Sequence, residues 1–225
     1  MLIYGKQPIY YLLEHHPQKI KTLYLAKEVD KKEYSRLMRM GFEIKRIPAN
    51  AAQSMSKSGN HQGFLAEIDE LELTPLQQIT DKSFVVILSG ITDVGNIGAI
   101  IRSAYALGVE AVIVSGLKQF PQEPVMRSST GALMDMPVVL HTNILDVMNE
   151  LKQAGFDLYG AVMNGTDAAT VKFGSKRALI LGSEGEGISK RAEAKLDHGI
   201  TITMAHAFDS LNVSAAGAIL MDRMK

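Results

Sequence analysis

Three polar residues that can donate and accept hydrogen bonds converge near the end of the chain, at Ser210, Asn212 and Ser214. They alternate with small and apolar residues, and they open an apolar stretch that runs to Met224. An ordinary helix start needs only one Ser or Asn as its N-cap. The cluster is therefore either a capped C-terminal helix or a polar site built beside one, and the residues alone leave both interpretations open.

A second candidate segment follows the strand-like run Phe84-Val85-Val86-Ile87-Leu88. Asn96 lies just before an apolar helical face, where we expect it to act as the N-cap. Gly98, Arg102 and Tyr105 recur at helical spacing and form a different face. A glycine there would permit close approach of a backbone or ligand. Arg102 is then either a solvated surface arginine or a guanidinium held beside a bound group.

A third segment, Gly182-Ser183-Glu184-Gly185-Glu186-Gly187, is a glycine-rich turn that follows the strand-like run 179–181. It is not a phosphate-binding P-loop, because no Gly-Lys-Ser/Thr follows it. Bare backbone amides and carbonyls in such a turn can hold the polar edges of a nucleoside.

In order and spacing, these three segments resemble the motifs of the SpoU family, which are RNA ribose 2′-O-methyltransferases of the SPOUT class. The resemblance spans roughly residues 84–225 and implies S-adenosylmethionine as the methyl donor, with no metal required. It places the donor against the backbone of Gly182, Ile202 and Leu211, and Met204 lies in the same motif as Ile202. It implies catalytic roles for five residues, namely Asn96, Arg102, Glu184, Ser210 and Asn212.

The role of Arg102 has two readings. Family proposals give the corresponding arginine the proton of the attacking 2′-hydroxyl. A guanidinium is effectively always protonated, however, so Arg102 could instead bind the adjacent phosphate and stabilise the developing oxyanion. Asn96, Glu184, Ser210 and Asn212 would then position Arg102 and the ribose.

The chain departs from the family pattern at three positions. Val94 and Thr203 stand where many members have proline, and His206 stands where a glycine is common. The loss of proline removes a fixed φ and no catalytic group.

The resemblance continues at the N-terminus. Ile3-Tyr4-Gly5-Lys6-Gln7-Pro8-Ile9 and Asn60-His61-Gln62-Gly63-Phe64-Leu65-Ala66 resemble the start and end of a small RNA-binding domain. This domain occurs in the SpoU branch that includes the bacterial enzyme methylating a guanosine of 23S ribosomal RNA, and SpoU enzymes acting on the tRNA D-loop typically lack it. Ribosomal RNA is thus the expected substrate. The alternatives are a tRNA 2′-O-methyltransferase and a catalytically silent RNA-binding ribosome-assembly factor.

Charge is distributed unevenly along a chain whose formal net charge is zero. Residues 1–66 hold 11 Lys and Arg against 5 Asp and Glu, so the excess positive charge lies in this part. Because nucleic-acid binding depends on cations facing phosphates, RNA docking is expected there. The other reading is an accidental skew of a solvated surface.

Composition excludes several classes of protein. The 225 residues include no Cys, which rules out disulfides, zinc–thiolate sites and cysteine nucleophiles. No apolar run approaches the ~20 residues that span a bilayer, and Lys6 interrupts any signal-peptide core. We therefore expect a cytoplasmic protein without a membrane partner. The histidines show no metal-ligand spacing.

Periodicity predicts an α/β protein in two parts: a small N-terminal α/β RNA-binding domain at residues 1–68 and a SPOUT domain at 83–225, joined by an acidic linker at 69–82. In the SPOUT domain, a largely parallel sheet should be covered on both faces. The resemblance adds a C-terminal trefoil knot and a homodimer, and small residues in the helix expected at 211–224 would allow close helix approach. The expected strands are 22–25, 42–47, 63–68, 84–89, 111–114, 137–140, 158–163, 178–181 and 200–204, and the expected helices are 7–14, 31–40, 51–56, 97–107, 144–154, 188–195 and 211–224.

Overall fold

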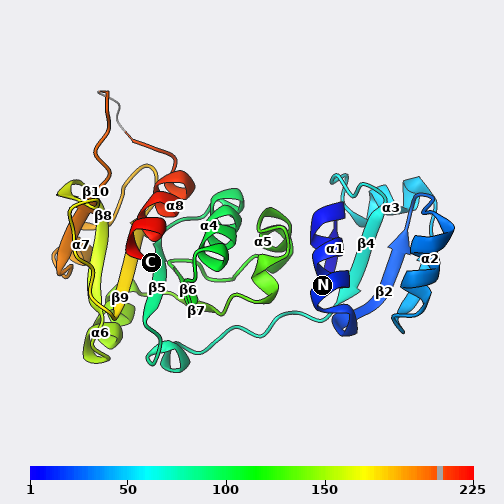
Figure 1. Ribbon diagram of the computed structural model, residues 1–225, viewed down its shortest axis with the longest axis horizontal. Coiled ribbons are helices and arrows are strands. Elements are labelled where there is room, and N and C mark those ends of the chain that lie inside the picture. Colours follow the sequence, from blue (N-terminus) through cyan, green and yellow to red (C-terminus); the bar gives the residue numbers. More distant parts are fainter. Residues whose placement is uncertain (207–209) are drawn as a thin grey trace. The chain divides into compact units, whose positions relative to one another are not determined.

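Two separate sheets organise the chain in the computed structural model, which describes residues 1–206 and 210–225. Residues 1–71 and 122–134 form one unit, and residues 72–121 and 135–225 form the second (Figure 1). The first unit thus includes a short segment that lies far along the sequence. We describe each unit by itself.

The first unit is a four-stranded sheet in the order β1-β4-β2-β3. β4 runs antiparallel to β1 and β2, whereas β2 and β3 are parallel. Its core is formed by fully buried aliphatic residues such as Ile3, Ile9, Leu23 and Leu65. The strands are β1 (Leu2–Tyr4), β2 (Ile20–Leu25), β3 (Glu43–Arg46) and β4 (Phe64–Ile68), and the helices are α1 (Lys6–His15), α2 (Lys31–Met38), α3 (Ala49–Met55) and α5 (Gln122–Ser128).

Local signals explain most of these elements. Asp30 caps α2 by accepting a hydrogen bond from the Glu33 amide at 2.8 Å. Gly41 follows with φ +89, a left-handed conformation that suits glycine after a helix. The sequence did not predict β1 or α5, and it carried α2 two residues too far, since α2 ends at Met38.

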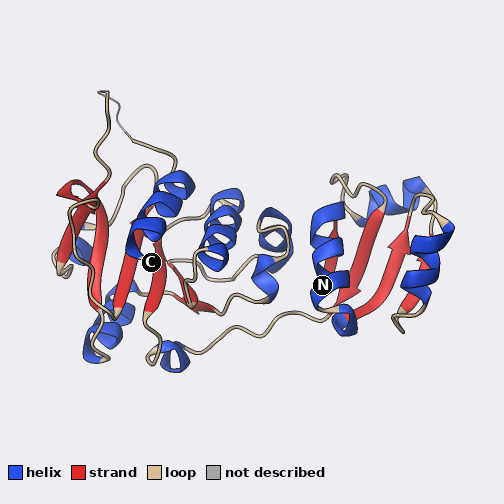
Figure 2. Cartoon of the chain, in the orientation of Figure 1, coloured by secondary structure: helices blue, strands red, loops and turns tan. Residues whose placement is uncertain are grey.

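The second unit contains a six-stranded parallel sheet in the order β10-β8-β9-β5-β6-β7 (Figure 2). The predicted parallel α/β architecture is confirmed. The strands are β5 (Phe84–Ser89), β6 (Ala111–Ser115), β7 (Val138–His141), β8 (Asp157–Asp167), β9 (Arg177–Gly182) and β10 (His198–Thr201), and the helices are α4 (Val94–Ala106), α6 (Ile144–Gln153), α7 (Lys190–Glu193) and α8 (Val213–Met224).

Both faces of the parallel sheet are covered, which explains why its central strands are apolar throughout. Alternate residues such as Val85 and Ile180 pack with α6, α7 and the short 3-10 helix Leu76–Ile79. On the other face α8 packs against α4 and β9, as Figure 1 shows. A Cβ on Gly217 of α8 would lie 2.9 Å from Leu181 Cδ1 and 3.8 Å from Ile100 Cγ1, so the small residue permits this close packing.

Three expectations for this unit need correction. The strand expected at 200–204 ends at Thr201, so Ile202, Thr203 and Met204 lie in the loop that follows β10. The helix expected at 188–195 is shorter, at Lys190–Glu193, with Ser189 as its N-cap. The expected linker also contributes core residues, because Leu76 and Ile79 are buried in the second unit. The trefoil knot that the resemblance implies stays a prediction.

No helix within residues 1–206 and 210–225 is both long and apolar enough to cross a membrane.

Candidate active site

The candidate site lies beyond the carboxyl ends of the parallel strands. Ser89 at the end of β5 pairs with Gly182 at the end of β9. β10 ends at Thr201, and Ile202 is the next residue. The segments that follow these strands therefore start from one side of the sheet, which is where open α/β sheets bind ligands. Asn96, Glu184 and Ile202 each follow one of these strands.

Asp93, and not Asn96, is the N-cap of α4. The Asp93 side chain accepts a hydrogen bond from the Asn96 amide at 2.7 Å, and α4 begins at Val94. The expectation that Asn96 would cap this helix is wrong, since a carboxylate three residues earlier occupies that role. The Asn96 side-chain amide is therefore available for other partners. Val94 stands at the first helical position, where proline is favoured but not required.

Asn96, Glu184 and Asn212 form a closed triangle of hydrogen bonds. Asn212 Nδ2 donates to Glu184 Oε1 at 2.6 Å and to Asn96 Oδ1 at 3.0 Å. Asn96 Nδ2 donates to the same Glu184 oxygen at 3.2 Å. The three residues come from α4, the glycine-rich turn and the start of α8, and all are exposed or partly exposed to solvent. The fold thus brings together three of the five predicted catalytic residues.

Asn212 also caps α8. Its Oδ1 accepts a hydrogen bond from the Ser214 amide at 2.9 Å, and the Ser214 hydroxyl donates to the same oxygen at 2.5 Å. Both initial interpretations of this segment therefore hold, because one side chain caps the helix with its oxygen and joins the polar triangle with its nitrogen.

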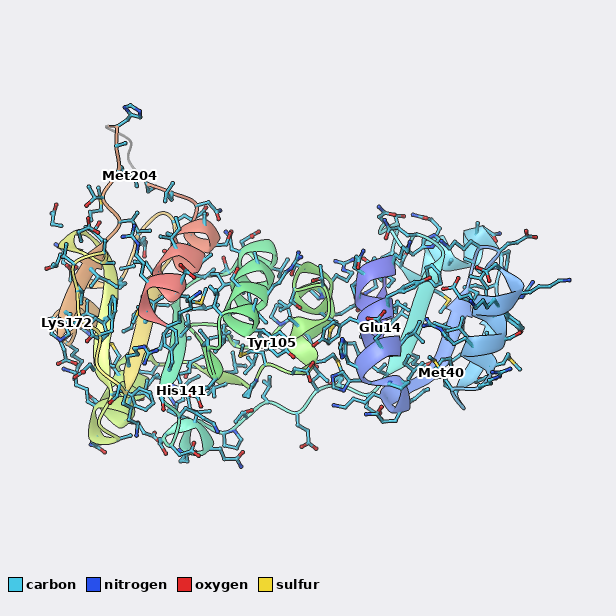
Figure 3. The ribbon with its side chains drawn as sticks, in the orientation of Figure 1. Glu14, Met40, Tyr105, His141, Lys172 and Met204 are labelled. Carbon is cyan, nitrogen blue, oxygen red and sulfur yellow. The ribbon has the colours of Figure 1, made fainter. Side chains whose placement is uncertain are left out.

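Arg102 is exposed on α4. Tyr105, which lies one turn further and is labelled in Figure 3, is 45% exposed. Gly98 is buried, so it does not share the solvent-facing surface that the spacing predicted. In the part of the chain that the structure describes, Arg102 has no ion pair or hydrogen bond through its side chain. Its guanidinium is thus accessible to a phosphate or a ribose.

A cavity of about 280 Å³ opens beside the start of α8. Ile202, Met204, Ser210 and Leu211 line it, so the structure brings together three of the four predicted donor-binding residues. Figure 3 shows Met204 on the segment that rises from the end of β10. Leu211 is the chain neighbour of Asn212, which places the cavity next to the polar triangle. The remaining lining is mostly apolar, with Ala161, Val162, Met163, Ile200, Thr201, Ala216 and Leu220.

Gly182, the fourth predicted donor contact, is not among the residues that line this cavity. It has a local structural role. A Cβ at this position would lie 2.1 Å from the Gly187 carbonyl carbon and 2.4 Å from the Ile188 amide nitrogen. The turn folds back on itself through a hydrogen bond of 2.9 Å from the Gly187 amide to the Ser183 carbonyl. Glycine at 182 is therefore required for the turn that presents Glu184.

Asp167, at the end of β8, is a residue that sequence reasoning missed. Its carboxylate accepts a hydrogen bond from the Thr203 hydroxyl at 2.7 Å and from the Ala169 amide at 2.9 Å. It also forms an ion pair with Arg223 of α8 at 3.1 Å. These donors, the Thr203 hydroxyl foremost, hold the pKa of the Asp167 carboxyl below its ordinary value. Thr203, one of the departures from the family pattern, thus ties the loop between Ile202 and Met204 to the sheet.

Two further polar residues lie outside this cluster. Arg127 of α5 stacks over the Tyr4 ring in the first unit, with its guanidinium carbon 4.2 Å from the ring centroid. Burial lowers the pKa of Arg127. His206 is exposed. Among the described residues, no group of three or more His, Asp or Glu is arranged to hold a metal ion.

Comparisons with known proteins identify the family of this chain. The model of the SpoU rRNA Methylase family matches residues 83–222, and the model described as RNA 2′-O ribose methyltransferase substrate binding matches residues 2–74. The 23S rRNA (guanosine-2′-O-)-methyltransferase RlmB of Vibrio cholerae is 30% identical over 232 residues, covering 98% of this chain and 94% of the relative. A putative TrmH family tRNA/rRNA methyltransferase of Staphylococcus haemolyticus is 34% identical, covering 79% and 75%.

Among solved structures, the SpoU methyltransferase AviRb from Streptomyces viridochromogenes, in complex with the cofactor AdoMet, is 28% identical. It superposes with a TM-score of 0.79, and the match covers 100% of this chain and 88% of that one. Both units therefore have counterparts in that structure. The family model alone spans more than half of the sequence, and the chain belongs to the SpoU rRNA methylase family.

Proposed function

We propose that this protein transfers a methyl group from S-adenosylmethionine to a ribose 2′-hydroxyl in ribosomal RNA, at a guanosine of the large subunit. The observation that carries the proposal is that adjacent residues join the cavity to the polar triangle. Leu211 lines the cavity, and Asn212 belongs to the triangle. The relative from Vibrio cholerae, named for this reaction, extends over nearly the whole chain. AviRb, which binds AdoMet, supports the identity of the donor.

The cavity suits such a donor. Ile202, Met204 and Leu211 offer apolar surface and backbone polar groups, and Ser210 offers a hydroxyl. Cavities that hold small ligands are mostly apolar with a few polar groups that fix orientation. When bound, S-adenosylmethionine would supply an electrophilic methyl group on its sulfonium sulfur. The ribose oxygen would take this methyl group as the methyl–sulfur bond breaks, and its hydroxyl proton would pass to solvent, to which Glu184 and Asn212 are exposed.

The residues of the triangle would orient the ribose. Glu184 offers a carboxylate that its neighbours hold in place, and Asn96 and Asn212 offer amides at fixed positions. Arg102 is the accessible cation on α4, and we assign it to the phosphate beside the target nucleotide and to stabilisation of the developing oxyanion. A permanently protonated guanidinium suits this role better than that of a base.

The two parts divide the work. Residues 1–68 would hold RNA and residues 83–225 would carry out transfer, with 69–82 between them. We also propose a homodimer. Val213, Leu220 and Met224 of α8 are buried within one chain, so they are not available to a partner. The partly exposed Ile219, with Tyr105 on neighbouring α4, remains as apolar surface for a second copy.

Mapping 2′-O-methyl groups in ribosomal and transfer RNA from cells lacking the protein tests the substrate. We expect one site in the large-subunit ribosomal RNA to lose its methyl group and to regain it with the wild-type gene, but not with Arg102→Ala. Loss confined to tRNA would favour the alternative that the name of the Staphylococcus relative allows. Unchanged methylation, with no donor binding in calorimetry, would favour the assembly factor.

Light scattering at micromolar concentration tests the dimer. A stable mass near the 24.6 kDa of one chain would exclude it.

A further inference from the structure

The topology of the first unit brings four cations to one edge of its sheet. Tyr4 at the end of β1 and Leu25 at the end of β2 pair with Leu65 and Phe64 at the start of β4. β3 runs parallel to β2, so its carboxyl end reaches the same edge. The chain at this edge carries four exposed cations, Lys6 after β1, Lys27 after β2, Arg46 at the end of β3 and Lys57 before β4. We call these four residues the basic edge.

Aromatic rings, and not carboxylates, hold three of these cations. Lys27 Nζ lies 4.5 Å from the centroid of Phe64, and Arg46 Cζ lies 4.8 Å from that of Tyr34. Lys6 Nζ lies 5.5 Å from the centroid of Tyr10. A ring restrains a cation without neutralising it. The positive charge of the basic edge is therefore both positioned and retained.

Two cations elsewhere in this unit pair with carboxylates. Lys21 forms an ion pair with Asp69 at 2.5 Å, and Lys45 forms one with Glu43 at 3.0 Å. In residues 1–206 and 210–225, no ion pair joins a residue of the basic edge to a carboxylate.

Two acids at the start of α2 accept hydrogen bonds from groups of the first unit. Asp30 accepts from the Glu33 amide at 2.8 Å, and Glu33 accepts from the Tyr10 hydroxyl. Burial and this hydrogen bond to Glu33 raise the pKa of Tyr10 to about 12, so the phenol keeps its proton at neutral pH. Glu28 is the remaining exposed acid between β2 and α2.

The loop at this edge is held in an unfavourable backbone conformation. Lys57, Ser58 and Gln62 have φ values of 50, 63 and 51, which is uncommon for residues with a side chain. Hydrogen bonds fix the loop to its neighbours, from the Ala26 amide to the Gly63 carbonyl at 2.9 Å and from the Lys6 amide to Gln62 Oε1 at 3.0 Å. Strain of this kind persists where surrounding contacts impose it, and it is concentrated at functional sites.

We propose that the basic edge binds consecutive backbone phosphates of the RNA substrate. The inference rests on the proposed function for the nature of the substrate, and it adds where on the first unit that substrate docks. Phe64 is 1% exposed, and Tyr4 is 6% exposed, so neither ring offers a stacking platform for a base. Contacts to phosphates provide affinity and orientation without reading the RNA sequence.

Replacement of the four cations by neutral glutamine tests the proposal. In one variant the four residues are replaced as K6Q, K27Q, R46Q and K57Q. A control variant carries K19Q, K21Q, R39Q and K45Q, which removes the same charge from exposed positions of the first unit outside the basic edge. Binding to a large-subunit ribosomal RNA transcript is measured across a salt series, with donor affinity and thermal unfolding as measures of an intact protein.

Each phosphate contact adds about 0.7–0.9 to the slope of log affinity against log salt, so the basic-edge variant should lose about 3 in this slope. The control should retain most of the wild-type slope. An equal loss in both variants, or none in the basic-edge variant, overturns the proposal. If the fourfold variant unfolds, the single variants K27Q and K57Q replace it, each expected to lower the slope by about 0.7–0.9, and unchanged slopes there also overturn it. A wild-type protein that binds neither RNA nor donor would instead contradict the proposed function.

Discussion

Asn212 Nδ2 donates a hydrogen bond to Glu184 Oε1 over 2.6 Å, while the Oδ1 of the same amide accepts from the first turn of α8. One side chain therefore couples the start of the last helix to the glycine-rich turn. Because the amide has one donor group and one acceptor group, its two functions can be separated by substitution.

Asn212→Ala should remove both functions, whereas Asn212→Ser should retain the cap. Serine and asparagine are comparable N-caps, and alanine costs about 0.5–2 kcal/mol. Urea unfolding should therefore show Asn212→Ala about 1 kcal/mol less stable than Asn212→Ser. Both variants should lose methyl transfer, since neither has the amide that holds Glu184. Full activity in a folded Asn212→Ser protein would show that the bond to Glu184 is not needed.

Arg102→Ala should strongly slow methyl transfer and leave the fold intact. The side chain is exposed on α4, away from the buried face formed by Ile97, Ile100 and Ile101. Loss of one group that stabilises developing charge reduces the rate by about 10²–10³-fold. Single-turnover methylation with saturating donor measures this, and Arg191→Ala, at another exposed helical arginine, is the matched control. A rate close to that of the wild type would remove Arg102 from the mechanism.

Gly182→Ala should disrupt the turn that presents Glu184, whereas Gly185→Ala should be tolerated. The added Cβ would collide with Gly187 and Ile188 in the first case and meet nothing within 4 Å in the second. Overpacking of this kind costs about 1–3 kcal/mol. We expect lower stability, and at least tenfold weaker methyl transfer, for Gly182→Ala alone. Equal behaviour of the two variants in thermal unfolding and activity would show that the turn can rearrange.

The sequence predicts the parallel sheet well, because strands buried on both faces are apolar runs with clear ends. It is less successful where patterns are short or continue past a boundary. β1 has three residues, and α5 contains Pro124, so neither gives a periodic signal. The strand predicted at 200–204 was too long because the alternation of its residues continues into the loop after Thr201.

The sequence likewise indicated some features of the site and not others. The resemblance indicated Asn96, Glu184 and Asn212, which the structure places in one triangle. The wrong cap assignment had a visible signal, since Asp93 lies three residues before Asn96 in the pattern of a helix start. The bond between Asp167 and Thr203 had none, because the two residues are 36 positions apart and only tertiary packing brings them together.

Asp167 should make the stability of the protein depend on pH. Its hydrogen bonds from Thr203 and Ala169 and its ion pair with Arg223 lower the pKa of the folded carboxyl. The unfolded value is about 3.9, so the stabilisation is fully present above that pH and is lost as the pH falls through the lower folded pKa. The difference in unfolding free energy between wild type and Asp167→Asn should therefore be constant from about pH 6 to pH 8 and should shrink below about pH 4.

Donor affinity at neutral pH provides the second measure of the same bond, since Thr203 lies between Ile202 and Met204. Asp167→Ala and Thr203→Val should each weaken donor binding in calorimetry, and the double variant should be little worse than either, because both substitutions remove the hydrogen bond between Asp167 and Thr203. Asp81→Ala, at an exposed acid that forms an ion pair with adjacent Lys82, is the control. Additive losses in the double variant would show that Asp167 and Thr203 act independently, and that the loop is positioned by other contacts.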